Sequence, residues 1–168
     1  MSAFPTGVAV VTSGGAERGP QGMTCSSITS ATLLPPTLLV CLRVGSATLK
    51  AVLSSGGFAV NLLHSAAQRA AEVFSGPVPD RFAQVSWRPS PAGHPWLVDD
   101  AFALAECRVS ETLTVGDHAV VLGEVCEISQ ITGTPLLYGL RRFASWPRGD
   151  DRVPGWPADV STRTNGRS

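Results

Sequence analysis

A short polar stretch near the N-terminus gathers side chains that can bind a ligand. Residues 22–27 contain the hydroxyls of Thr24, Ser26 and Ser27, and they follow a valine-rich run. Hydroxyls and free backbone amides donate hydrogen bonds without adding charge, which suits a cofactor with carbonyl, hydroxyl or phosphate groups. A polar turn between two strands would have the same composition, and composition alone favours the turn.

A second polar group stands at the start of an expected helix. Ser46, Ala47 and Thr48 come directly after an apolar run, and Lys50 follows them. The first turn of a helix has unpaired amides and a partial positive charge, so it can bind a phosphate, and Lys50 would add a full charge. The simpler interpretation is an ordinary N-cap by Ser46, which needs no ligand.

Two further polar positions lie beside apolar strands. Asn61 stands among apolar neighbours, where its amide needs hydrogen-bond partners from a cofactor or from a neighbouring strand. Asp117 and His118 follow Gly116 in a tight turn, and the aspartate can hold the imidazole in position to orient a substrate. A surface histidine without such a role is commoner in turns.

The sequence lacks the motifs of enzymes that catalyse reactions with their own side chains. The chain has no Gly-x-Ser-x-Gly motif, no paired carboxylates and no His-Glu-x-x-His motif. Its four cysteines, Cys25, Cys41, Cys107 and Cys126, form no closely spaced pair, so we expect free thiols in a reducing compartment and no metal site. Such a chain is typical of proteins whose cofactor carries the chemistry.

Composition excludes several classes of partner. The 168 residues include 13 basic and 13 acidic side chains with a formal net charge of +0, and no basic patch that would bind nucleic acid is visible. No apolar run has the length of a membrane span and no signal peptide is recognised, so we expect a cytoplasmic protein without membrane contact. At 43% hydrophobic residues, the chain is expected to bury apolar surface in a core or between subunits.

The elements that must position the polar groups are mostly strands. Alternating or continuous apolar patterns predict strands over residues 7–12, 26–32, 37–44, 58–63, 101–112, 118–128 and 136–143. Helices are predicted over residues 46–53 and 66–74, capped by Ser46 and Ser65. Residues 13–22 are expected to be a hairpin loop, and residues 76–95 to wrap the surface with a short strand near 85–87.

These elements predict a mainly β fold, namely a closed or split β-barrel with two short helices. There is no βαβ alternation and no Gly-x-Gly-x-x-Gly motif, which argues against a Rossmann domain. Residues 1–145 form the expected domain. Residues 146–168 are rich in proline, glycine and polar residues and are expected to be a loosely ordered tail.

Taken in order, these segments resemble the flavin reductase family with the FMN-binding split-barrel fold. Members serve as the small reductase components of two-component flavin-dependent monooxygenases. The matching segments are residues 4–12, 22–27, 35–42, 46–48, 58–63, 81–82, 116–118 and 138–143. Relatives usually carry a helix before the first of these segments, which here begins at Phe4.

The resemblance also implies site residues. His118 would lie near the nicotinamide and is the expected catalytic residue. The residues expected to bind the cofactor are Met23, Thr24, Cys25, Ser26, Ser27, Val40, Cys41, Leu42, Ser46, Ala47, Thr48, Lys50, Asn61, Leu62, Phe82, Tyr138, Arg142 and Phe143.

The resemblance finally implies an NADH-dependent reductase of free FAD or FMN, with FAD slightly favoured, that supplies reduced flavin to a monooxygenase. It also implies a homodimer with flavin near the subunit interface. A non-catalytic flavin-binding module on the same barrel is the alternative. A pyridoxamine-phosphate oxidase-like enzyme fits less well, because its phosphate site should be richer in basic residues than residues 46–50.

Overall fold

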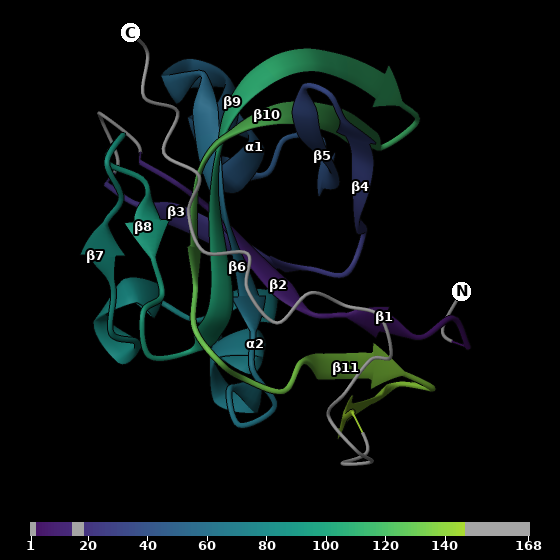
Figure 1. The fold of residues 1–168 in the computed structure, drawn as a ribbon, viewed down its shortest axis with the longest axis vertical. Coiled ribbons are helices and arrows are strands. Elements are labelled where there is room, and N and C mark those ends of the chain that lie inside the picture. Colours follow the sequence, from purple (N-terminus) through teal and green to yellow (C-terminus); the bar gives the residue numbers. More distant parts are fainter. Residues whose placement is uncertain (1–2, 15–18, 147–168) are drawn as a thin grey trace, which may run out of the picture.

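A seven-stranded antiparallel sheet forms the body of the protein in the computed structural model, which describes residues 3–14 and 19–146. The strand order is β3-β2-β6-β9-β10-β5-β4. The bounds are β2 (Ala9–Ser13), β3 (Gln21–Cys25), β4 (Ile28–Leu33), β5 (Pro36–Arg43), β6 (Gly57–Leu63), β9 (Ala101–Val115) and β10 (His118–Gln130). Strongly twisted sheets of this size curl, and here the curl makes a barrel (Figure 1).

The barrel closes where the two edge strands follow each other in the chain. β3 and β4 lie at opposite edges of the sheet but are joined by Ser26 and Ser27. The backbone N–H of Cys41 in β5 donates to the carbonyl of Ser27, at 3.0 Å. This bond links the β3–β4 connection to β5, and the mainly β, split-barrel prediction is confirmed. We call Cys25, Ser26, Ser27 and Cys41 the seam.

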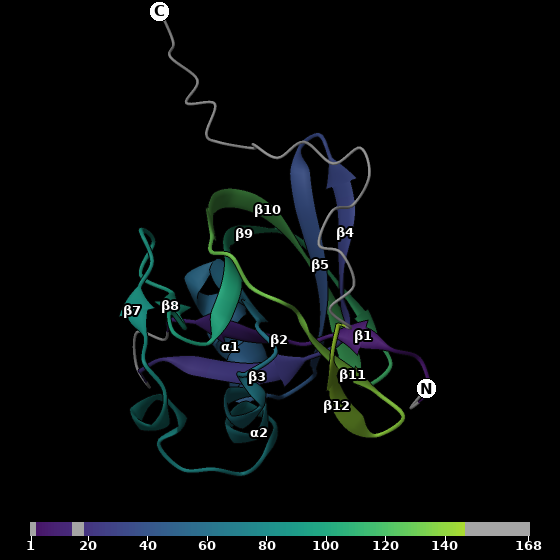
Figure 2. The same cartoon turned by 60° about the horizontal axis from the view of Figure 1, so that its bottom comes forward.

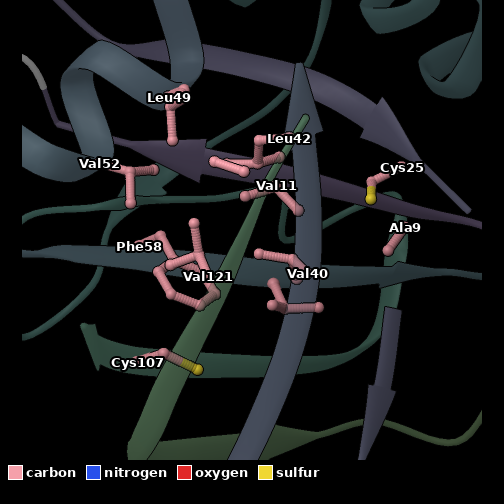
Figure 3. Packing of buried hydrophobic residues seen from close by; sticks show 12 residues of the cluster. Ala9, Val11, Cys25, Val40, Leu42, Leu49, Val52, Phe58, Cys107 and Val121 are labelled. Carbon is pink, nitrogen blue, oxygen red and sulfur yellow. The ribbon is translucent and has the colours of Figure 1, made fainter. Parts of the chain in front are cut away.

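Side chains of alternate residues fill the barrel. Val40 and Leu42 of β5 are fully buried beside Val11 and Phe58, and α1 (Ala47–Ser55) adds Leu49 and Val52 (Figure 3). Gly123 is required in this core, because a Cβ there would lie 2.5 Å from the Phe58 ring.

A second cluster packs outside the barrel beneath α2 (Gln68–Ser75). Its buried members, here called the α2 cluster, are Val8, Val10, Leu63, Ala67, Ala70, Ala71, Val73, Phe74, Leu97 and Leu136. A small sheet of β1 (Thr6–Gly7), β11 (Leu136–Gly139) and β12 (Arg142–Ser145) lies beside it, and the β4–β5 hairpin extends away from α2 (Figure 2). A 3₁₀ turn, η1 (Arg81–Gln84), and the ribbon of β7 (Arg88–Pro89) and β8 (Pro95–Trp96) complete the fold.

The element predictions were wrong at four places. Part of the expected loop and polar turn forms strand β3, which pairs with β2. The single strand expected over residues 136–143 is a hairpin, β11–β12, that turns at Leu140 and Arg141. Helix α2 starts after Ala67 without a side-chain cap, rather than at Ser65. No strand forms at residues 85–87; the two short strands of this region, β7 and β8, both follow in the chain.

β1 and η1 were not predicted, and the remaining elements were predicted to within a few residues. The tail predicted for residues 146–168 lies, apart from Trp146, outside the described residues. No helix in the described part of the chain combines the length and apolar character that crossing a membrane requires.

Candidate functional site

The seam is held by hydrogen bonds between small polar side chains and β5. The Ser27 hydroxyl donates to the Cys41 carbonyl at 3.2 Å, and the Cys25 thiol approaches the same carbonyl at 3.8 Å. Ser26 and Ser27 are exposed, whereas Cys25 is buried. Burial raises the pKa of the Cys25 thiol, so it stays protonated at neutral pH and is not a nucleophile. The seam therefore offers neutral hydrogen-bonding groups at the surface.

Strand alternation divides the expected residues of β5 between two faces. Val40 and Leu42 are 0% exposed and point into the barrel core, so only their backbone is available to a ligand. Cys41 and Arg43, one residue out of phase, lie on the outer face. His118 of β10 is the cross-strand partner of Arg43 and shares that outer face.

The turn before β10 fixes His118 at the end of β5. The Val44 amide donates to the Asp117 carbonyl at 2.9 Å, and Gly116 has the positive φ of 59° that the turn requires. The His118 Nδ1 and Asp117 Oδ1 atoms are 2.8 Å apart, and the His118 side chain is 47% exposed. This hydrogen bond to His118 lowers the pKa of the Asp117 carboxyl. The imidazole is thus held on one side and open to solvent on the other.

The start of α1 lies next to this turn. Ser46 caps the helix by accepting a hydrogen bond from the Leu49 amide at 3.1 Å, and its own amide bonds the Arg43 carbonyl. The ordinary N-cap expected for Ser46 is confirmed. Ala47 and Lys50 are exposed, whereas Thr48 is buried. The structure therefore brings together the seam, the first turn of α1 and His118.

Met23 and Thr24 point to opposite faces of β3. Thr24 donates from its hydroxyl to the Ala71 carbonyl of α2 at 2.6 Å, and Met23 packs against the barrel core. Gly22 permits the close approach of α2, since a Cβ there would lie 2.9 Å from the Phe74 ring. This part of residues 22–27 mainly holds β3 against its neighbours.

Asn61 and Leu62 lie on opposite faces of β6. The Asn61 amide donates to the Val10 carbonyl and the Thr12 hydroxyl, at 2.9 and 3.1 Å, and accepts from the Leu97 amide at 2.7 Å. Asn61 is 0% exposed, so these internal partners account for its side chain and we leave it out of the cofactor site. Leu62 is half-buried and faces the barrel mouth.

Four expected residues lie at the α2 cluster instead of beside His118. Phe82 makes edge contacts with Phe74 and Trp87, with ring centroids 5.1 and 5.6 Å apart. Tyr138 and Phe143 contact each other at 5.1 Å and pack on the same cluster, and Arg142 is exposed beside them on β12. Phe82, Tyr138 and Phe143 thus pack on the α2 cluster.

An apolar groove opens at the mouth of the barrel. It measures about 360 Å³ and is lined by side chains of β4, β5, β6, β9 and β10, among them Ile28, Leu38, Leu62, Val125 and Ile128. Ile128 is 64% exposed, and Leu33 and Leu34 at the β4–β5 tip are 79% and 91% exposed. Contiguous exposed apolar surface of this kind marks an interaction site.

A second cavity, of about 780 Å³, contains a buried polar network. The Glu106 carboxylate accepts hydrogen bonds from the Ser90 hydroxyl and the Ala92 amide, at 2.7 and 3.1 Å. His94 Nδ1 accepts from the Gly14 amide at 3.1 Å, and its own amide donates to Ser90. These groups satisfy one another, so the network is structural.

Because burial lowers the pKa of His94 below its usual 6.5, folding should become acid-sensitive. The unfolded chain then binds a proton more readily than the folded chain, so stability is lost as pH falls below about 6.5, until the pH reaches the folded pKa. Melting temperatures measured from pH 8 to pH 5 should fall across this window. His94→Gln should flatten the fall and His64→Gln should not; equal slopes in both variants would contradict the assignment.

The site fits a flavin better than a metal. Neutral hydroxyls and amides at the seam match the polar edge of an isoalloxazine ring, and the exposed cation Lys50 lies near the N-terminus of α1, where a phosphate would bind. Among the described residues, no three His, Cys, Asp or Glu side chains are grouped to hold a metal ion. Arg43 was missed by the sequence analysis; its alternation with Cys41 could have placed it on the His118 face.

Comparison with known proteins gives one consistent result. Residues 1–147 match the model of the flavin reductase like domain. The chain is 56% identical over 151 residues to a flavin reductase (NADPH) of Lentzea aerocolonigenes, covering 89% of this chain and 88% of that one.

Two solved structures are similar over most of the chain. Nitrilotriacetate monooxygenase component B from Mycobacterium thermoresistibile has a TM-score of 0.84 at 32% identity, covering 98% of this chain and 93% of its own. An NADH:FAD oxidoreductase of Streptomyces globisporus, in complex with NAD and FAD fragments, has a TM-score of 0.83 at 34% identity, covering 89% and 90%.

Proposed function

The chain belongs to the flavin reductase family, and we propose that it transfers hydride from NADH to FAD held at the seam, with His118 positioning the nicotinamide. It is a flavin reductase that supplies reduced flavin to a partner monooxygenase. FMN is the second flavin considered. The relative named as NADPH-dependent makes NADPH the second reductant to be compared.

One observation carries the assignment of the site. The seam, the first turn of α1 and His118 come from three distant parts of the sequence, and the bonds from Cys41 to Ser27, Ser46 to Arg43 and Val44 to Asp117 bring them together. Bound flavin supplies the hydride acceptor. The chain supplies neutral donors for the ring edge, Lys50 and the α1 amides for the phosphate region, and an oriented imidazole for the second substrate.

We further propose that the apolar groove is covered by a second copy of this chain. The groove and the exposed Leu33, Leu34 and Ile128 present more apolar surface than scattered residues would. The family resemblance supports a homodimer with flavin near the interface. Sedimentation should give twice the monomer mass, and a monomer at assay concentrations would contradict this part of the proposal.

The test of the proposed function is NADH oxidation followed at 340 nm, with and without added flavin. We expect turnover that depends on added flavin, faster with FAD than with FMN, and faster with NADH than with NADPH. A protein that retains tightly bound flavin and oxidises neither nucleotide would instead be a flavin-binding module, such as an electron carrier or sensor.

A further inference from the structure

Arg43 is an exposed cation at the edge of the proposed site, and its side chain forms no hydrogen bond or ion pair with the residues that the structure describes. It lies on the outer face of β5 at the strand's last position, directly across from His118. The ion pairs of the described residues join Arg108 to Glu124 and Asp117 to His118, and none includes Arg43. No hydrogen bond of its guanidinium is found there either. An arginine held at a substrate-facing position without an internal partner is available to a ligand.

Three charged side chains, Arg43, Asp117 and Lys50, stand at this end of the barrel. The carboxylate of the turn, Asp117, lies 2.8 Å from the His118 imidazole. The pKa of Asp117 is lowered chiefly by that hydrogen bond, with a smaller contribution from Arg43, which shows that Arg43 lies close to the turn. Lys50 adds a second exposed cation on α1. The formal net charge of the chain is +0, so this grouping is local.

We infer that Arg43 binds the pyrophosphate of the nicotinamide dinucleotide, which makes it a substrate-positioning residue. The inference rests on the proposed placement of the nicotinamide at His118. A single ribose separates the nicotinamide from the pyrophosphate, whereas the 2′-phosphate of NADPH lies beyond it on the adenosine ribose. A cross-strand neighbour of His118, with Cα atoms about 5 Å apart, therefore meets the pyrophosphate first. The guanidinium forms two parallel hydrogen bonds to phosphate oxygens, which a lysine cannot reproduce.

The test is a calorimetric titration of the purified protein with NAD⁺, NADP⁺ and FAD, each separately. Arg43→Ala should weaken the binding of NAD⁺ and of NADP⁺ alike, by at least about tenfold, because it removes two charge-assisted hydrogen bonds from each complex. Arg43→Lys should recover part of the loss. The affinity for FAD should stay within about twofold of the wild-type value, which is a small change in binding free energy. Arg88→Ala, which removes an arginine from β7, is the matched control and should change none of the three.

Three results would overturn the assignment. Unchanged dinucleotide affinities would leave Arg43 without a role in binding. A loss confined to NADP⁺ would place it at the 2′-phosphate, and an equal loss for FAD would place it at the flavin phosphate. Because oxidised dinucleotides bind without turnover, the titration tests the role of Arg43 independently of the reductase assay. If the wild-type protein oxidises NADH but Arg43→Ala binds both dinucleotides normally, the assignment of Arg43 fails while the proposed function stands.

Discussion

Asn61→Ala should lower the melting temperature more than any other single polar substitution in the barrel wall. The side chain joins β6 to Val10 and Thr12 of β2 and to Leu97, in a place where it is 0% exposed. Alanine would leave the Leu97 amide and the Val10 carbonyl without these partners, away from water. Buried groups stripped of a partner cost about 1–3 kcal/mol each, so we expect a loss of roughly 3 kcal/mol. For a domain of this size that corresponds to a fall of about 6–12 °C.

Thermal unfolding followed by circular dichroism measures this loss of stability. A flavin titration of the same variant distinguishes a structural role of Asn61 from a contact with the cofactor. Ser110→Ala is the matched control, because it also removes a side-chain hydrogen bond, to the Leu122 carbonyl, but from an exposed site; its cost should be below about 0.5 kcal/mol. If Asn61→Ala melted like the wild type but bound flavin more weakly, Asn61 would be a cofactor contact after all.

The strands with strong apolar periodicity could be predicted from sequence, and β3 could not. β5, β6, β9 and β10 alternate or are continuously apolar, and each was found within a few residues of its predicted bounds. Apart from Met23, β3 consists of small and polar residues, so its strand character comes from its neighbours: β2 on one side and α2 above it, with Gly22 against Phe74. The β11–β12 turn was missed because Leu140 and Arg141 take positive φ values of 52° and 61°, where glycine or asparagine would normally signal the turn.

The site could be predicted as a set of segments but not as a set of side chains. Ordered motifs pointed to residues 22–27, 40–42, 46–48 and 118, and the fold brings these together. Which side chains face outward depends on register: Cys41 and Arg43 lie with His118, whereas Val40 and Leu42 fill the core. The burial of Asn61 depends on the segment around Leu97, which is distant in sequence and carries no periodic signal. Contacts set by tertiary packing are invisible to local pattern.

His118→Ala should lower kcat/KM for NADH by on the order of 100-fold while leaving flavin affinity nearly unchanged, since a misplaced reactant loses about that much rate. Asp117 fixes one imidazole nitrogen at 2.8 Å, which leaves the other free for the nicotinamide carboxamide. The flavin contacts proposed at the seam, Ser26, Ser27 and Cys41, do not include His118. At 47% exposure, its removal opens no cavity in the core, so the melting temperature should not move.

The measurement is steady-state kinetics with NADH varied at saturating flavin, together with a separate flavin titration of each variant. Asp117→Asn should show a smaller loss than His118→Ala, because the imidazole remains but loses the carboxylate that orients it. His64→Ala, which removes a histidine bonded to the Asp99 carbonyl, serves as the histidine control and should retain the wild-type rate. If His118→Ala lost flavin affinity and nicotinamide use in parallel, the imidazole would support the flavin itself. The nicotinamide would then have to be placed elsewhere on this face, and the proposed role of Arg43 would move with it.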